Sequence, residues 1–241
     1  MSRSLSFLRL SRQSFARIAP RAVYLSRGFV RPHDSTKYQM VTSLTPTCLS
    51  CGAQLPTRLP VCPSCNFIAR VDESVPYHEL LGLPYDPNPF IVDTALLKRR
   101  FLDAQRICHP DGWATKSEAE KGAALELSNA VNAAYKTLTS PLHRVEYILR
   151  RNGVETGEED QLDDIELISE IMETREEIDN IQPGNAERLL ALRDENNTKI
   201  SEVARTIEEL VAREDWPQTR RAAVRLKYLD TIDDSIKRRL V

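Results

Sequence analysis

FIVDTALLKRRFLDAQRICHPDGWATKSEAEKGAALELSNAVNAAYKTLT, residues 90–139, is the stretch of this 241-residue chain that decides its fold. Apolar side chains recur every three to four residues in its first part and again in its last part, which predicts two amphipathic helices. We expect the first helix over Phe90–Ile107 and the second over about Ser117–Thr139. Between them, Pro110 disfavours a helical conformation of His109 and so predicts a loop over residues 109–112.

Capping signals mark the starts of both helices. Asp86 or Asn88, each followed by a proline, predicts the start of the first helix. Ser117-Glu118-Ala119-Glu120 has the composition of an N-terminal cap for the second helix.

Helical patterns continue on both sides of these two helices and predict a mainly α fold. A short helix is expected over Tyr77–Leu81, and Pro141 starts a further set of helical turns that ends near Arg151. After a hinge at residues 152–160 we expect three more helices, over about 162–181, from there to about residue 213, and from about Pro217 to the C-terminus. Residues 70–75 are expected to be a linker. No β-hairpin signal lies outside residues 48–65.

Four of the five cysteines form two C-x-x-C pairs, Cys48 with Cys51 and Cys62 with Cys65, separated by ten residues. Two intervening residues let a tight turn direct both sulfurs to one point, and two such turns complete a tetrahedron of thiolates around Zn²⁺. We therefore expect a structural zinc module at residues 45–70, with no open metal position for catalysis. A mononuclear iron, an iron–sulfur site and a redox dithiol are the alternatives. Cys108 lies outside this spacing, and we expect it to pack or to lie at a helix end.

Residues 1–31 have the composition of a mitochondrial transit peptide, which places the protein in the mitochondrial matrix. Seven arginines precede the first acidic residue, Asp34, and arginines interrupt every apolar stretch, unlike in a secretory signal. A reducing compartment of this kind argues against paired disulfides among the cysteines. A disordered basic tail is the alternative interpretation of this segment.

Without residues 1–31 the chain is acidic. Removing their seven arginines from the 33 basic residues of the chain leaves 26 against 35 acidic residues, a net charge near −9. This charge disfavours a general nucleic-acid binder, which needs a basic face to neutralise phosphates. No apolar run approaches the roughly 20 residues that cross a bilayer, so we expect no membrane span.

The motifs of the chain resemble those of the J-domain co-chaperones. The resemblance rests on Tyr77-His-Glu-Leu-Leu-Gly-Leu83, Phe90, Leu97, Phe101, Gln105, His109-Pro-Asp111 and Asn132-Ala-Ala-Tyr135-Lys-Thr-Leu138. Ser140-Pro-Leu-His-Arg-Val-Glu-Tyr-Ile-Leu149 is typical of the HscB subfamily, which the chain resembles over residues 77–241. This resemblance implies a J-domain over 76–151 and a C-terminal three-helix bundle over 160–241, together in an L shape, in a co-chaperone that is not an enzyme. The four-cysteine front end is similar to that of some mitochondrial members.

The resemblance also implies a docking surface for a mitochondrial DnaK-type chaperone that has bound ATP. It consists of His109, Pro110, Asp111, Lys98, Arg99, Arg100 and Arg106. Docking there biases the partner towards its hydrolysis-competent state, so the partner and not this chain cleaves ATP. A row of Lys and Arg favours a fast, salt-sensitive encounter with an acidic surface. A solvated helix face is the alternative interpretation of these basic residues.

A second surface that the resemblance implies binds the iron–sulfur cluster scaffold protein. It consists of Ile168, Met172, Glu173, Glu176 and Tyr228. Ile168 and Met172 are i, i+4 neighbours on one helix and form an apolar patch, which the two glutamates surround with charge. The alternative is that these apolar residues are core, the position that we expect for Ile165, Ile171 and Ile178.

Two other classes of function remain open. A general J-protein that delivers unfolded clients is disfavoured because no Gly/Phe-rich stretch follows residue 151. An enzyme or redox protein centred on the cysteines would be distinguished by a chromophore. A catalytic His109–Asp111 pair is disfavoured, because no serine or cysteine nucleophile lies beside it in a recognisable context.

Overall fold

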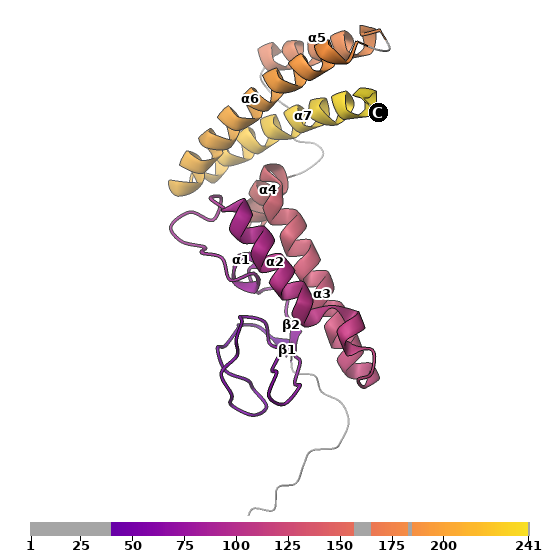
Figure 1. The fold of residues 1–241 in the computed structure, drawn as a ribbon. Helices are drawn as coiled ribbons and strands as arrows, with labels where there is room; N and C mark the ends of the chain where they lie inside the picture. The colour runs from indigo at the N-terminus through magenta and orange to yellow at the C-terminus, as the bar shows by residue number, and fades with distance from the viewer. Residues whose placement is uncertain (1–39, 157–164, 183–184, 241) are drawn as a thin grey trace, which may run out of the picture. The chain divides into compact units, whose positions relative to one another are not determined.

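The computed structural model describes residues 40–156, 165–182 and 185–240 (Figure 1). These residues form a mainly α protein, which confirms the predicted fold class. The predicted transit peptide at residues 1–31 lies outside the described residues. The elements in chain order are β1 (Met40–Val41), β2 (Arg70–Val71), α1 (Tyr77–Leu80), α2 (Thr94–Cys108), the 3₁₀ helix η1 (Pro110–Trp113), α3 (Glu118–Thr139), α4 (Pro141–Arg151), α5 (Ile165–Asn180), α6 (Ala186–Ala212) and α7 (Trp216–Leu240).

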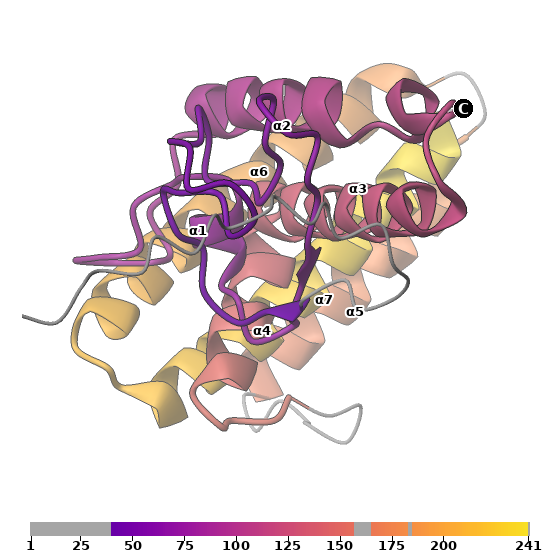
Figure 2. The ribbon, with the colours of Figure 1, turned by 90° about the horizontal axis from the view of Figure 1, so that it is seen from below.

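α2 and α3 form a helical hairpin and lie side by side (Figure 2). The ring of Phe101 in α2 stacks on the ring of Tyr135 in α3, with centroids 4.1 Å apart. α3 begins with the predicted cap, since the Ser117 hydroxyl accepts from the backbone N–H of Glu120 and the Glu120 carboxylate accepts from that of Ser117. Both the cap and the apolar period are local properties, which is why they are visible in the sequence.

The start of α2 differs from the prediction. The carboxylate of Asp93 accepts from two backbone N–H groups of the first helical turn, so the helix begins after Asp93 and not near Phe90. Asn88 instead holds a separate turn: its side-chain oxygen accepts from the N–H of Phe90 at 2.9 Å. Its amide donates to the carbonyl oxygen of Glu208 in α6 at 2.8 Å. This distant partner is the reason why Asn88 does not cap α2.

A first hydrophobic core joins the cysteine segment, residues 40–71, to the helices that follow it. Its buried side chains include Val41, Leu44, Leu59, Val61 and Ile68 from the segment, and Leu80, Leu81, Leu97, Ala104 and Leu127 from α1, α2 and α3. β1 and β2 pair in parallel, so Arg70 and Val71, predicted as part of a linker, form a strand instead. Arg70 also forms an ion pair with Glu126 of α3 at 3.1 Å. The cysteine segment is therefore packed against α1–α3 rather than tethered to them.

A second core lies among α4, α5, α6 and α7. α6 and α7 pack along each other, and α4 and α5 pack against α7 (Figure 1). α4 is a complete helix with the buried Arg144, whose guanidinium donates to the carbonyl oxygens of Leu138 and Phe90, each at 2.8 Å. Burial lowers the pKa of Arg144 to about 10, and the carbonyl partners compensate for its desolvation. Among the helices that the structure describes, none combines the length and the apolar character needed to span a membrane.

Candidate metal centre and interaction surfaces

Two backbone turns with the same hydrogen-bond pattern bring the four cysteines together. The backbone N–H of Cys48 donates to the carbonyl oxygen of Ala53, and that of Cys62 donates to that of Phe67, both at 2.8 Å. Each C-x-x-C pair is followed by a residue with positive φ, Gly52 in the first turn and Asn66 in the second. Only this left-handed conformation lets the chain reverse directly after the second sulfur.

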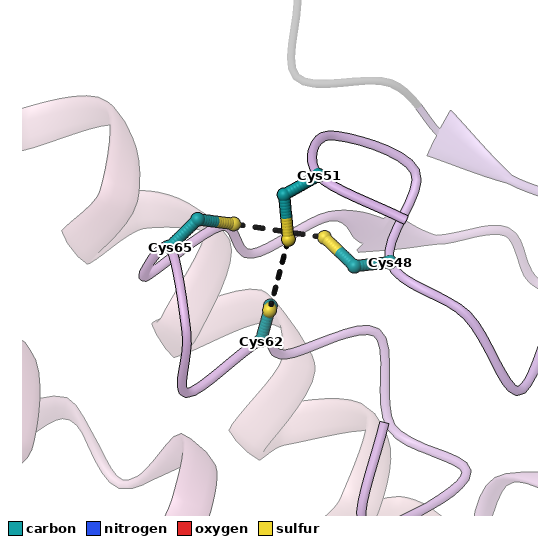
Figure 3. A group of neighbouring side chains, drawn as sticks. All are labelled: Cys48, Cys51, Cys62 and Cys65. Atoms are coloured by element: carbon teal, nitrogen blue, oxygen red, sulfur yellow. Dashed lines mark hydrogen bonds between the residues drawn. The ribbon is translucent and has the colours of Figure 1, made fainter. Parts of the chain in front are cut away.

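The four sulfurs point toward a common centre (Figure 3). All of them lie within 4.8 Å of one another, with 3.6 Å between Cys48 and Cys65 and 3.7 Å between Cys51 and Cys62. A tetrahedral zinc ion with Zn–S bonds of 2.3 Å places its sulfurs about 3.8 Å apart, so the site fits one metal ion. The four thiols are free and not paired as disulfides. The predicted cluster of metal-binding cysteines is thus confirmed.

The ionisation of the four thiols favours a cation at their centre. Backbone N–H donation, chiefly from Cys65, lowers the pKa of Cys62 to about 6. Partial desolvation and the three neighbouring sulfurs raise the pKa of Cys65 to about 12. Repulsion between thiolates therefore prevents all four from ionising together unless a cation neutralises them.

Cys108 does not belong to this site. It is the last residue of α2 and is completely buried, as the sequence predicts. Burial raises its pKa to about 11, so the thiol stays protonated and unreactive at neutral pH.

His109, Pro110 and Asp111 form a presented turn between α2 and α3. The Nδ1 atom of His109 accepts from the backbone N–H of Asp111 at 3.3 Å, so the imidazole holds the turn. The indole of buried Trp113 donates to the carbonyl oxygen of Ile107 at 3.1 Å and anchors the turn to α2. The side chain of Asp111 is 93% exposed. The turn therefore presents a carboxylate to solvent, with Oδ2 of Asp111 3.6 Å from Nδ1 of His109.

The four predicted basic residues of α2 are all exposed, but they face two different surfaces. Lys98, Arg99 and Arg106 surround the exposed side chain of Leu102 on one face. Arg100 lies at the wall of a cleft next to the cysteine segment. The sequence analysis treated the four as one row and missed Leu102, although its spacing from Lys98, Arg99 and Arg106 puts it on their face.

The predicted apolar patch of α5 is exposed and larger than expected. Ile168 and Met172 are 37% and 58% exposed, whereas Leu167 and Ile171 are buried. Ile165, predicted as core, is 80% exposed, so that prediction was wrong. The reason is helical geometry: residues 165, 168 and 172 share one face, and the buried residues of α5 lie on the opposite face. Ile171 and Ile178 are buried as predicted.

The charged residues around this patch also have defined positions. Glu173 and Glu176 are exposed, and Glu173 accepts from the hydroxyl of Ser169 at 3.3 Å. Arg175 of α5 donates to the hydroxyl of Thr231 in α7 at 2.9 Å. Half-buried Tyr228 lies one turn before Thr231 and packs against the second core. The patch thus has an apolar centre with exposed carboxylates on the same helix, and Tyr228 lies on α7, against which α5 packs.

Several known proteins that resemble the chain belong to one family of co-chaperones. Residues 163–237 match the family model of the HSCB C-terminal oligomerisation domain. The co-chaperone protein HscB homologue of Vibrio vulnificus (strain CMCP6) is 35% identical over 164 residues, which cover 67% of this chain and 94% of that protein. The human iron–sulfur cluster co-chaperone protein HscB is 29% identical over 214 residues, covering 86% and 88% of the two chains.

The fold leads to the same group. The crystal structure of human co-chaperone protein HscB matches with a TM-score of 0.67 and 29% identity, covering 80% of this chain and 97% of that one. The sequence match to the human protein is longer than the whole stretch 77–241, so it extends into the residues before Tyr77. The likeness therefore includes part of the chain outside the helices.

Proposed function

Because the chain belongs to the HscB family of co-chaperones for iron–sulfur cluster assembly, we propose that it binds a cluster scaffold protein, delivers it to a mitochondrial DnaK-type chaperone and stimulates the ATPase of that chaperone. Residues 76–151 act as the J-domain and residues 160–241 as the scaffold-binding bundle. ATP is bound and cleaved by the partner, because the role of a co-chaperone is to shift a conformational equilibrium in that partner.

The observation that carries this proposal is the presented carboxylate of Asp111. It is 93% exposed on a turn held by His109 and anchored by Trp113. An exposed carboxylate on an anchored turn is suited to meet a basic group of a partner. Lys98, Arg99 and Arg106 lie on the adjoining helix and attract an acidic surface of the same partner, with the salt sensitivity of exposed charges.

Single-turnover ATP hydrolysis by the chaperone tests this part of the proposal. The full chain accelerates hydrolysis, and Asp111→Ala abolishes the acceleration, while Glu118→Ala, which removes another exposed carboxylate of the same region, retains it. Addition of scaffold protein increases the acceleration further. Acceleration that is indifferent to scaffold points to a general J-protein for unfolded clients, and no acceleration refutes the proposal.

The scaffold binds the exposed patch of α5. Ile165, Ile168 and Met172 supply the apolar centre, Glu173 and Glu176 the acidic rim, and Tyr228 the aromatic contact from α7. An apolar patch of this kind surrounded by charge is a common design of a protein–protein interface, in which a few central side chains provide most of the affinity.

Scaffold binding by the double variant Ile168→Ala/Met172→Ala tests this surface. Loss of two central apolar contacts weakens binding roughly 30- to 1,000-fold in a calorimetric titration, on the basis of about 1–2 kcal/mol for each contact. Leu190→Ala, which removes an exposed leucine of α6, serves as the control and binds as tightly as the parent. A double variant with the affinity of the parent contradicts the assignment.

The metal of the four-cysteine site is structural zinc, held by Cys48, Cys51, Cys62 and Cys65 in the module at residues 45–70. Two properties support zinc: four thiolates close the coordination sphere, and sulfur separations below 4.8 Å leave no room for a cluster of several irons and sulfides. Colourless protein with one zinc per chain supports this assignment, and visible absorption contradicts it.

The protein functions in the mitochondrial matrix, and residues 1–31 direct it there. The Arg-rich, carboxylate-free composition of these residues supports the location. A reporter that carries residues 1–31 and stays outside mitochondria would refute it.

A further inference from the structure

The cysteine segment and the helices enclose a cleft between them. It has a volume of about 650 Å³ and lies between the loop that follows the first C-x-x-C pair and the helices α1 and α2. Leu55 and Leu59 line it from the loop, and Leu80 and Leu81 from the end of α1. The cleft therefore has an apolar floor, and it exists only because the segment is packed against α1–α3.

Two guanidinium groups stand at the walls of this cleft. Arg58 comes from the cysteine segment and Arg100 from α2, and both side chains are exposed. Within the described parts of the chain, neither of them has an ion-pair partner. The one carboxylate of the cleft, Asp103, is paired with Arg106 at 2.8 Å. The cleft thus presents uncompensated positive charge above an apolar floor, which fits an apolar peptide segment with carboxylates beside it.

The stem of Arg58 lies beside Gly82, the residue that follows the end of α1. A β-carbon added to Gly82 would lie 3.7 Å from Cγ of Arg58, and Gly82 has a φ of +61°. The side chain of Arg58 is exposed, so its charged end is available to a partner at the cleft.

Arg100 faces the cleft, whereas Lys98, Arg99 and Arg106 face the surface that the proposed function assigns to chaperone docking. The two surfaces adjoin on α2, since Asp103 lines both, and this favours the chaperone as the partner. We propose that the cleft between the cysteine segment and α2 is a second contact site for the same DnaK-type chaperone, which inserts an apolar segment flanked by acidic residues. This inference rests on the proposed function and gives the zinc module a role in binding beyond its own stability.

The N-terminal residues of this chain are a poor occupant of the cleft. Residues 1–33 carry seven arginines and no carboxylate, so their charge has the same sign as that of Arg58 and Arg100. The scaffold protein is assigned to the patch of α5, a different helix with an acidic rim.

Charge reversal of Arg58 tests the inference in the full chain. Binding of the ATP-bound chaperone, measured without scaffold, weakens roughly three- to tenfold in Arg58→Glu, as expected for loss and reversal of one exposed interface charge. Arg205→Glu, which reverses an exposed charge in α6, binds like the parent. Asp111→Ala in the same assay reports on the proposed function: if it loses binding while Arg58→Glu does not, the cleft inference alone fails. If both variants bind like the parent, the proposed function fails as well.

A photo-crosslinking residue at position 58 identifies the occupant directly. Crosslinks from position 58 to the chaperone, absent from a crosslinker at position 205, support the inference. Crosslinks from position 58 to the scaffold protein or to a second copy of this chain overturn it, and so does the absence of any crosslink under conditions in which the chaperone is bound.

Discussion

His78 is a completely buried titratable side chain in α1. Its Nε2–H donates to the carbonyl oxygen of Pro89 at 2.9 Å, and the edge of its ring meets the ring of Tyr85. Nδ1 is buried, and the described residues offer it no hydrogen-bond partner. Burial lowers the pKa of His78, and the charges of Arg144 and Arg151 lower it further. The imidazole is therefore neutral in the folded protein.

This neutral histidine predicts a loss of stability in acid. In the unfolded chain His78 titrates near its ordinary pKa of about 6.5, so below that pH the unfolded state binds one more proton than the folded state. The free energy of unfolding consequently falls as the pH drops below about 6.5, by at most about 1.4 kcal/mol per pH unit. His78→Gln, which can still donate to Pro89, removes this slope between pH 6.5 and 5 in urea denaturation.

His143→Gln is the matched control for this measurement. His143 is an exposed histidine of α4, so a slope that is lost in His78→Gln and kept in His143→Gln assigns the effect to the buried imidazole. Equal slopes in the parent and in His78→Gln would show that His78 is not held neutral.

At the scale of single residues, the sequence allowed prediction of those whose role depends on chemical type and spacing. The four cysteines, which the structure brings together, are of this kind. Ile165 is not of this kind. Its apolar side chain is typical of a core residue, but the packing of α5 against α7 decides which face of α5 is buried, and Ile165 lies on the other face. Arg144 is similar, because its carbonyl partners come from α3 and from a distant loop.

At the scale of elements, local caps decide where helices start. The box at the start of α3 joins Ser117 and Glu120 by reciprocal hydrogen bonds, and the donation from Ser117 lowers the pKa of Glu120. Ser117→Ala therefore destabilises the protein by about 1 kcal/mol, measured as a lower urea midpoint with an unchanged slope. Ser201→Ala is the control, because Ser201 lies inside α6 and bonds only back to its own helix; it is neutral or slightly stabilising. Equal losses in both variants would contradict the role of the cap.

A capping residue could be predicted from the sequence only where the helix start had a single candidate. Asn88 and Asp93 both have capping side chains, and both precede apolar residues. Asp93 caps α2, whereas Asn88 is held by Glu208, 120 residues further along the chain. The proline that follows Asn88 favoured the earlier position, so the predicted start of α2 was too early.

At the scale of the whole described molecule, the cysteine segment and the hairpin share one core. Leu59 and Ile68 of the segment are buried in the same cluster as Leu80 and Leu97 of the helices. The parallel pairing of β1 with β2 closes the segment against α3. Strands of two residues carry no recognisable period, so the sequence indicated a separate module with a linker. Because the core is shared, we expect metal binding by the segment to stabilise the helices as well.

Removal of the metal is therefore expected to affect residues that do not bind it. Binding of a structural zinc ion provides the free energy that folds such a module, so a strong chelator unfolds residues 45–70 and exposes the faces of Leu80 and Leu81. Exposure of two to three apolar side chains costs roughly 2–4 kcal/mol, which lowers the Tm of the helical transition by roughly 5–15 °C. Far-UV circular dichroism before heating changes little, because the helices lie outside the segment. Restoration of the Tm by added zinc excludes damage by the chelator. A helical transition at the same Tm with and without metal would mean that the two parts do not share a core in solution.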